Sequence, residues 1–182
     1  MASSTGYSAP GLKAPQEQVK PSYVLSFNEL LDLENWQVTN DGVMGGLSEG
    51  KTQVLEQALN FYGRVSTQNN GGFTSVYLPL ATLPKSFEYL KITVQGDGRP
   101  YQLRLRSRAM AYNIVYQHSF ATEEGKVQSL SFKLADFAAS FRGRIITDAP
   151  VLTAQSISHV GFLISSKQNT QFSLSTSEIE FY

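Results

Sequence analysis

From residue 59 to the C-terminus, apolar and polar residues alternate along the chain in a series of short segments. Leu59 and Phe61, for example, alternate with Asn60 and Tyr62. A two-residue period places side chains on opposite faces of a half-buried β-strand. We therefore predict strands over 59–65, 73–80, 89–94, 101–106, 114–120, 129–134, 158–164, 172–174 and 179–181.

Turn-forming pairs separate these segments. Asn70-Gly71, Asp97-Gly98 and Glu124-Gly125 have the chemistry of tight turns between antiparallel strands. Regularly spaced short strands with such turns are typical of an all-β domain with two packed antiparallel sheets, a sandwich or jelly roll. The pattern stops between residues 135 and 153. We interpret that region as a long crossover loop, anchored by Phe137, with Arg142 and Arg144 facing solvent.

The first residues have a different composition from the rest. Residues 1–22 contain Pro10, Pro15 and Pro21 and little apolar content, which is typical of a flexible tail. Residues 23–182 are expected to form a single β-sandwich domain. Ser26 and Glu29 have the spacing of a helix capping box, so a short N-terminal helix is predicted through Leu30, Leu31 and Leu33.

Composition excludes several classes of protein. The 182 residues include no cysteine, and 15 basic side chains balance 15 acidic ones. Disulfides and thiolate metal sites are therefore impossible, and the net charge does not favour nucleic acid as a partner. No apolar run approaches the roughly 20 residues of a membrane span. The first residues lack the features of a signal peptide, so a cytoplasmic location is expected.

Catalytic and cofactor motifs are absent from the sequence. There is no G-x-S-x-G elbow, no H-E-x-x-H motif, no P-loop and no G-x-G-x-x-G fingerprint. We therefore predict a protein without enzymatic activity and without a cofactor. His118 and His159 are interpreted as buried structural residues. We leave open whether the domain binds a structural calcium ion. The candidate oxygen ligands are Asp32, Asp41, Glu178 and Glu180.

A polar, glycine-rich segment follows the only tryptophan, Trp36. Residues 40–48 read NDGVMGGLS, with three glycines in five positions. Glycine lets the backbone adopt positive φ and approach other groups closely. Asn40, Asp41 and Met44 are our candidate ligand or partner contacts in this loop. The alternative is a tight structural connection in which Met44 closes the end of the core.

Three arginines alternate along one predicted strand. Arg104, Arg106 and Arg108 lie two residues apart, so their side chains leave the same face, while Leu103 and Leu105 face the core. We expect the strand that begins near residue 113 to pair with this one and to add Gln117 to the same face. Arginine and amide groups there suit an anionic or hydroxyl-bearing partner. Arg104, Arg106 and Gln117 are therefore candidate binding residues, and Arg108 is interpreted as solvated.

Three blocks in order resemble the signatures of the complex I intermediate-associated protein family. They are residues 40–48, residues 69–76 (NNGGFTSV) and residues 96–106 (GDGRPYQLRLR). The resemblance runs from about residue 27 to residue 182. It implies a galactose-binding-domain-like β-sandwich, similar to some carbohydrate-binding modules. It also implies a role in assembling a respiratory or photosynthetic complex, as in the best-known members of the family.

Three functions compete on these observations. The first is a non-catalytic, chaperone-like binding or assembly factor that holds a protein partner, or a small polar or anionic ligand, on one sheet face. The second is a sugar binder of the carbohydrate-binding-module kind, with stacking platforms at Tyr62, Tyr77, Tyr112 and Tyr116. An enzyme with an unfamiliar site ranks last.

Overall fold

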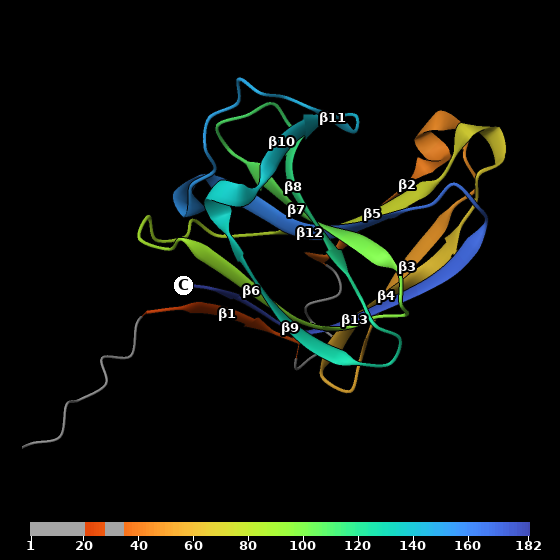
Figure 1. The fold of residues 1–182 in the computed structure, drawn as a ribbon, viewed down its shortest axis with the longest axis horizontal. Coiled ribbons are helices and arrows are strands. Elements are labelled where there is room, and N and C mark those ends of the chain that lie inside the picture. Colours follow the sequence, from red (N-terminus) through yellow and green to blue (C-terminus); the bar gives the residue numbers. More distant parts are fainter. Residues whose placement is uncertain (1–20, 28–34) are drawn as a thin grey trace, which may run out of the picture.

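The chain forms two antiparallel β-sheets packed face to face, as a computed structural model that describes residues 21–27 and 35–182 shows (Figure 1). Between the strands lie short 3-10 segments: η2 (Asp41–Met44), η3 (Gln68–Asn70), η4 (Leu134–Asp136) and η5 (Ala154–Ser156). Among the described residues there is no helix with the length and apolar character needed to cross a membrane.

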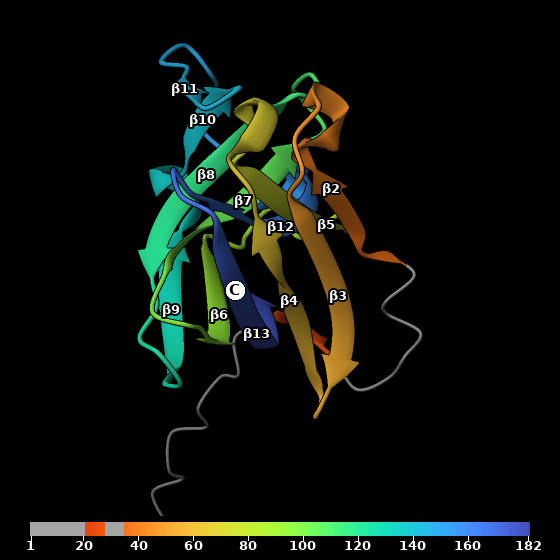
Figure 2. The same ribbon diagram turned by 90° about the vertical axis from the view of Figure 1, so that its right-hand side faces the viewer.

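One sheet has six strands. They are β1 (Tyr23–Ser26), β3 (Glu49–Leu55), β4 (Ala58–Val65), β6 (Tyr89–Gln95), β9 (Val127–Lys133) and β13 (Thr170–Phe181). The order is β3-β4-β13-β6-β9, and β1 also pairs with β13. The long strand β13 lies at the centre: β4 pairs with its first part and β1 with its last part, while β6 runs along its other side (Figure 2).

The second sheet has seven strands. They are β2 (Gln37–Asn40), β5 (Phe73–Pro79), β7 (Pro100–Ser107), β8 (Ile114–Ala121), β10 (Ala138–Phe141), β11 (Arg144–Ile145) and β12 (Ile157–Ser165). Their order is β11-β10-β8-β7-β12-β5-β2. Strand β7 therefore lies inside the sheet, between β8 and β12, and residues of three strands meet across its outer face.

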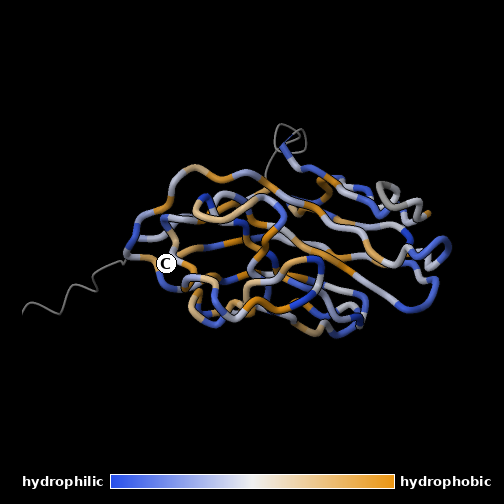
Figure 3. Tube along the Cα trace, turned by 90° about the horizontal axis from the view of Figure 1, so that it is seen from above, coloured by the Kyte–Doolittle hydropathy of each residue, from blue (hydrophilic) through white to orange (hydrophobic). Residues whose placement is uncertain are grey.

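The core lies between the two sheets and is built from the inward side of each alternating strand. Leu59, Leu103 and Leu174 are completely buried there. Phe61 and Phe172 meet edge to face with ring centroids 4.8 Å apart. Figure 3 shows apolar positions along the strands and hydrophilic residues at many of the turns. Burial of these apolar faces is the main favourable term in folding.

The structure confirms the strands predicted from alternation and adds others. The segments 172–174 and 179–181 belong to one strand, β13. A bulge between Thr176 and Glu178 shifts the alternation, so the sequence pattern resembled two separate strands. Strands β1, β2 and β3 were not predicted. The predicted helix through Leu30, Leu31 and Leu33 lies outside the described residues.

The interpretation of residues 135–153 as a crossover loop was wrong in part. Residues 138–141 form β10 and residues 144–145 form β11, at the edge of the seven-stranded sheet. Both strands are too short to show a clear two-residue period. Phe137 is buried and Arg142 and Arg144 are exposed, as predicted.

Candidate functional site

The strand register gathers the predicted arginines and amide on the outer face of the seven-stranded sheet. Arg104 of β7 lies opposite Gln117 of β8, and Arg106 lies opposite His159 of β12. Leu103 and Leu105 alternate with them and are completely buried. The outward direction of the two arginines is therefore confirmed. We call the surface formed by Gln102, Arg104, Arg106, Gln117, Tyr77, Tyr112 and His159 the arginine face.

Arg106 is held between two aromatic rings. Its guanidinium carbon lies 3.9 Å from the ring centroid of Tyr77 and 4.0 Å from that of Tyr112. Tyr112 belongs to the loop between β7 and β8 and is 67% exposed, whereas Tyr77 is buried. Stacking of this kind attracts a cation to the ring faces and keeps the guanidinium plane in one orientation.

A glycine makes room for the ring of Tyr77. Gly161 of β12 lies opposite Tyr77 of β5, and a Cβ atom on Gly161 would lie 2.7 Å from the Tyr77 ring. The ring of Tyr77 thus covers a position where the sheet has no side chain. Sequence reasoning placed neither Tyr77 nor Tyr112 beside the arginines, although a glycine inside a strand is a sign of close approach.

Arg104 is positioned by amide side chains. Its Nε donates to Gln102 Oε1 at 3.0 Å, and its Nη2 donates to Gln117 Oε1 at 3.4 Å. The same Gln117 oxygen accepts a hydrogen bond from the hydroxyl of Ser140 on β10, at 3.0 Å. Gln117 therefore joins three neighbouring strands at the position that sequence analysis assigned to it.

Among the described residues, no carboxylate forms an ion pair with the two arginines. The salt bridges among the described residues involve Lys91, Arg99 and Lys126, and neither Arg104 nor Arg106. The Nε of Arg106 is buried and has no hydrogen-bond partner. Burial, together with the charges of Arg106 and Arg108, lowers the pKa of His159. This histidine is therefore neutral at pH 7, and the positive charge of the face resides on the arginines.

The predictions for neighbouring residues hold only in part. Arg108 is exposed, as its interpretation as a solvated residue requires, and its guanidinium also donates to the carbonyl of Ile157 and, at 2.6 Å, to that of Leu80. His159 was interpreted as a buried structural residue, yet it is only half-buried and lies on the outer face, edge-on to Tyr112 with ring centroids 6.3 Å apart. The bulge in β12 between Ile157 and His159 shifts the register there. His118, also interpreted as a buried structural residue, is only half-buried and lies against Phe132 and Phe137.

The glycine-rich loop contains a buried carboxylate. Asp41 has no exposed surface, and it accepts hydrogen bonds from the Ser48 hydroxyl at 2.6 Å and the Ser48 backbone N–H at 3.0 Å. It also accepts from the backbone N–H groups of Gly72, at 2.7 Å, and Phe73, at 3.2 Å. Asp41 thus joins the first family-like block to the second, and the two segments lie side by side in Figures 1 and 2. These contacts favour the structural alternative for this residue.

Asn40 has a similar internal role. Its Oδ1 accepts from the Gly50 backbone N–H at 2.8 Å and from the Thr74 hydroxyl at 2.6 Å. Met44 ends the 3-10 segment η2, and its side chain lies outside what the structure describes. The arginine face and the glycine-rich loop come from different strands, so the six predicted site residues form two groups. A binding role for Asn40, Asp41 and Met44 stays a prediction.

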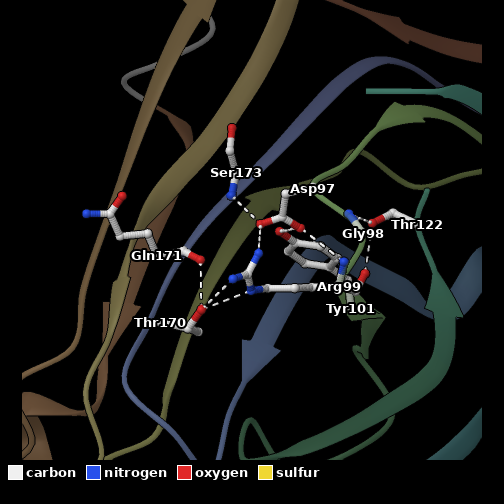
Figure 4. Close-up of polar contacts among 8 residues, drawn as sticks. All are labelled: Asp97, Gly98, Arg99, Tyr101, Thr122, Thr170, Gln171 and Ser173. Atoms are coloured by element: carbon white, nitrogen blue, oxygen red, sulfur yellow. Dashed lines mark hydrogen bonds and ion pairs between the residues drawn. The ribbon is translucent and has the colours of Figure 1, made fainter. Parts of the chain in front are cut away.

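A second carboxylate, in the third family-like block, links the two sheets (Figure 4). Asp97 accepts from the Tyr101 hydroxyl at 3.0 Å, from the Arg99 side chain at 3.1 Å and from the Ser173 backbone N–H at 3.0 Å. Arg99 and Tyr101 lie on or beside β7, whereas Ser173 lies on β13 of the other sheet. Burial and the neighbouring Asp97 charge raise the pKa of Tyr101, so its hydroxyl keeps its proton. Sequence reasoning missed this link because its members are far apart in the chain.

The candidate calcium ligands that the structure describes do not form a metal site. Across the described ranges, no group of three or more His, Cys, Asp or Glu side chains is placed to hold a metal ion. Glu178 and Glu180 instead form salt bridges with Lys91. Asp41 is occupied by the donors given above, and Asp32 lies outside the described residues.

The four tyrosines proposed as sugar platforms do not share one surface. Tyr62 lies on the outer face of the six-stranded sheet, and Tyr77 and Tyr112 enclose Arg106 on the other sheet. Tyr116 is buried, and its hydroxyl donates to the Pro150 carbonyl at 2.7 Å. Strand alternation alone separates inward from outward residues but does not say which sheet a strand joins.

Comparison with known sequences gives two findings. A family model for complex I intermediate-associated protein 30 matches residues 25–176. The mitochondrial complex I intermediate-associated protein 30 of Mus musculus is 27% identical over 180 residues, which cover 87% of this chain and 54% of the mouse protein. The chain thus spans about half the length of this curated relative. That name places the mouse protein in mitochondria, and a cytoplasmic location for this chain stays a prediction.

Solved structures with the same fold include carbohydrate-binding modules. A family 11 module from Clostridium thermocellum, in complex with a β-1,3-1,4-mixed-linked tetrasaccharide, has a TM-score of 0.63 and 9% identity, covering 87% of this chain and 94% of the module. The family 11 module of a cellulosomal cellulase from the same organism has a TM-score of 0.64 and 12% identity, covering 88% of this chain and 94% of that module. At such identities the likeness concerns the fold alone. It confirms the predicted jelly-roll sandwich of two antiparallel sheets.

Proposed function

Because the chain belongs to the complex I intermediate-associated protein 30 family, we propose that it is a non-catalytic assembly-factor domain for a respiratory or photosynthetic protein complex. In this proposal it acts like a chaperone and holds a protein partner on the arginine face. The family resemblance supports the class of function. The choice of surface rests on the contacts of this chain's own residues.

The observation that carries the proposal is that, within residues 21–27 and 35–182, neither Arg104 nor Arg106 forms an ion pair with a carboxylate. Two adjacent arginines on one strand face repel each other unless anions approach them. Stacking between Tyr77 and Tyr112 holds Arg106 in place, and amides hold Arg104. Binding then orders few side chains, which lowers its entropic cost.

The chemistry of this face selects a partner with carboxylate groups. Guanidinium groups bind carboxylates with two parallel hydrogen bonds, and those bonds are stronger than neutral ones. The exposed ring of Tyr112 adds an apolar contact beside the charge, and tyrosine and arginine are enriched where protein partners bind most tightly. We therefore expect an acidic segment of a protein partner to bind across β7, with hydrogen bonds to Arg104 and packing on Tyr112.

Charge reversal tests this proposal. The full chain and the double variant Arg104→Glu/Arg106→Glu would be used as baits in extracts of the native organism, and the recovered proteins identified by mass spectrometry. The matched control is Arg142→Glu/Arg144→Glu, because both residues are exposed on the edge hairpin and the charge change is the same. Circular dichroism and thermal melts establish that each bait is folded.

We expect the wild type and the control to recover the same partner, and the face variant to lose it. Capture should also weaken as salt rises, because salt screens exposed charges over distances of about 10 Å at 0.1 M. If the reversal variant does not fold, Arg104→Gln/Arg106→Gln removes the charge with less perturbation. A folded face variant that recovers every wild-type partner would exclude this surface.

A further inference from the structure

The outer face of the six-stranded sheet, opposite the arginine face, has a groove along its central strand. Two adjoining hollows of about 460 Å³ each meet at Ser173. Both sizes fall in the range of about 300 to 1,000 Å³ that is usual for ligand sites. Ser173, Ser175 and Ser177 of β13 form the floor, and we call this feature the serine groove.

The groove exists because its floor carries small side chains and its edges do not. The turn between β3 and β4 borders one side with Leu55 and Glu56, and Glu124 and Val127 border the other. Ser173 lies opposite Tyr62 of β4, and Ser175 lies opposite Asn60 and Gln95. The inward neighbours Phe172 and Leu174 are buried, so the floor is fixed by the core beneath it.

The polar groups on the floor of the groove and directly beside it on β4 and β6 are neutral, and several are unused. In the described ranges, the hydroxyls of Ser173, Ser175 and Tyr62 have no hydrogen-bond partner within the protein. Asn60 and Gln95 each use an amide N–H on a backbone carbonyl, which leaves their amide oxygens as acceptors. The groove thus combines hydroxyl groups, which both donate and accept, with amide acceptors.

Charge and backbone pairing narrow the class of ligand. Glu56 and Glu124 border the first hollow and are exposed, which disfavours an anionic ligand. In the second hollow Glu49 accompanies Lys51 and Arg64, so neither charge dominates. Strand β13 is paired on both sides, and a peptide cannot extend the sheet there. A ligand must bind through side chains alone.

We propose that the serine groove binds a neutral, linear oligosaccharide. The hydroxyl groups of such a chain match the serine hydroxyls and amide oxygens, and the half-buried ring of Tyr62 offers an apolar surface for the face of one sugar ring. The site lies on the other sheet from the arginine face and does not depend on the assembly role. Each can be lost without the other.

Affinity electrophoresis in native gels tests this inference. The probes are soluble mixed-linkage β-glucan, xylan and mannan as neutral chains, and polygalacturonate as an anionic chain. Ser175→Arg places a long side chain across the floor, and Tyr62→Ala removes the platform. Ser131→Arg is the matched control, because Ser131 is exposed on β9 of the same sheet and outside the groove. Thermal melts check folding, and Ser173→Arg replaces Ser175→Arg if the latter unfolds.

We expect at least one neutral polysaccharide to retard the wild type, with apparent affinity at least tenfold weaker in Ser175→Arg and Tyr62→Ala. Ser131→Arg and the Arg104→Glu/Arg106→Glu variant should be retarded like the wild type. Three outcomes would overturn the inference: no retardation by any neutral chain, retardation by polygalacturonate alone, or equal retardation of wild type and groove variants. Loss of binding in the arginine variant would place the site on the other face.

Discussion

The carboxylate of Asp41 accepts hydrogen bonds from both polar groups of Ser48, the backbone N–H at 3.0 Å and the hydroxyl at 2.6 Å. The same hydroxyl oxygen accepts from the Ser66 N–H at 2.9 Å and lies 3.2 Å from the Ser66 carbonyl oxygen. Together with the Gly72 N–H, these groups form a buried network that holds the glycine-rich loop against the segment before β5. A fully satisfied network of this kind stabilises one loop geometry.

Replacement of Asp41 by Asn should destabilise the domain by about 2 to 3 kcal/mol, because the amide NH₂ would face N–H and O–H donors that lose their acceptor. Urea denaturation followed by circular dichroism measures the change. Asp136→Asn is the control, since Asp136 is an exposed carboxylate in η4. Equal midpoints for the two variants would contradict the structural role of Asp41.

The hydrogen bonds to Asp41 also predict how the stability of the domain depends on pH. Burial raises the pKa of Asp41, but the hydrogen bonds from Ser48, Gly72 and Phe73 outweigh it and leave the pKa below its ordinary value. A carboxyl with a lowered folded-state pKa stabilises the fold above its unfolded pKa, about 3.9, and loses this effect as pH falls through the folded value. Melting temperatures of wild type and Asp41→Asn should therefore converge below about pH 4. A constant difference from pH 6 to pH 2 would argue against the lowered pKa.

Gly46 and Gly45 are constrained for different reasons. A Cβ on Gly46 would lie 2.2 Å from an Asp41 carboxylate oxygen, and Gly45 has a φ of +84° with open space around it. We expect Gly46→Val and Gly45→Val to destabilise by about 1 to 3 kcal/mol, more than Met44→Ala. Thermal melts rank the variants. Gly42→Ala is the control, since nothing lies within 4 Å of that position, and a control as unstable as Gly46→Val would refute the steric argument.

Arg108 should act in stability and not in binding. Its guanidinium donates to the carbonyls of Ile157 and Leu80 and so connects the start of β12 with the end of β5. Arg108→Ala should cost about 1 kcal/mol, because Arg108 is exposed and water competes for its hydrogen bonds. Arg144→Ala is the matched comparison, because Arg144 is exposed as well and its guanidinium has no hydrogen bond to the described residues. Chemical denaturation distinguishes them, and partner capture by folded Arg108→Ala should match that of wild type.

The sequence by itself determined the fold class and the direction of most side chains. Alternation of Leu103 and Leu105 with Arg104 and Arg106 was enough to place two leucines in the core and two arginines outside, because a strand has a period of two residues. The alternation did not predict the strands correctly where the two-residue period is interrupted or covers too few residues. Because of the bulge in β13, the sequence predicted two strands where there is one, and the short strands β10 and β11 show no clear period.

Only the tertiary structure decided which outward residues meet. Arg106 and Tyr77 are 29 positions apart by residue number, yet the order β7-β12-β5 and the absence of a side chain at Gly161 bring them into contact. Asp41 was a candidate ligand in the sequence, and the fold surrounds it with donors from residues 48, 72 and 73. The local pattern specifies a face of a strand, whereas strand order and close approach specify neighbours. Such neighbours are determined by packing across the whole sheet, and no local pattern in the sequence indicates them.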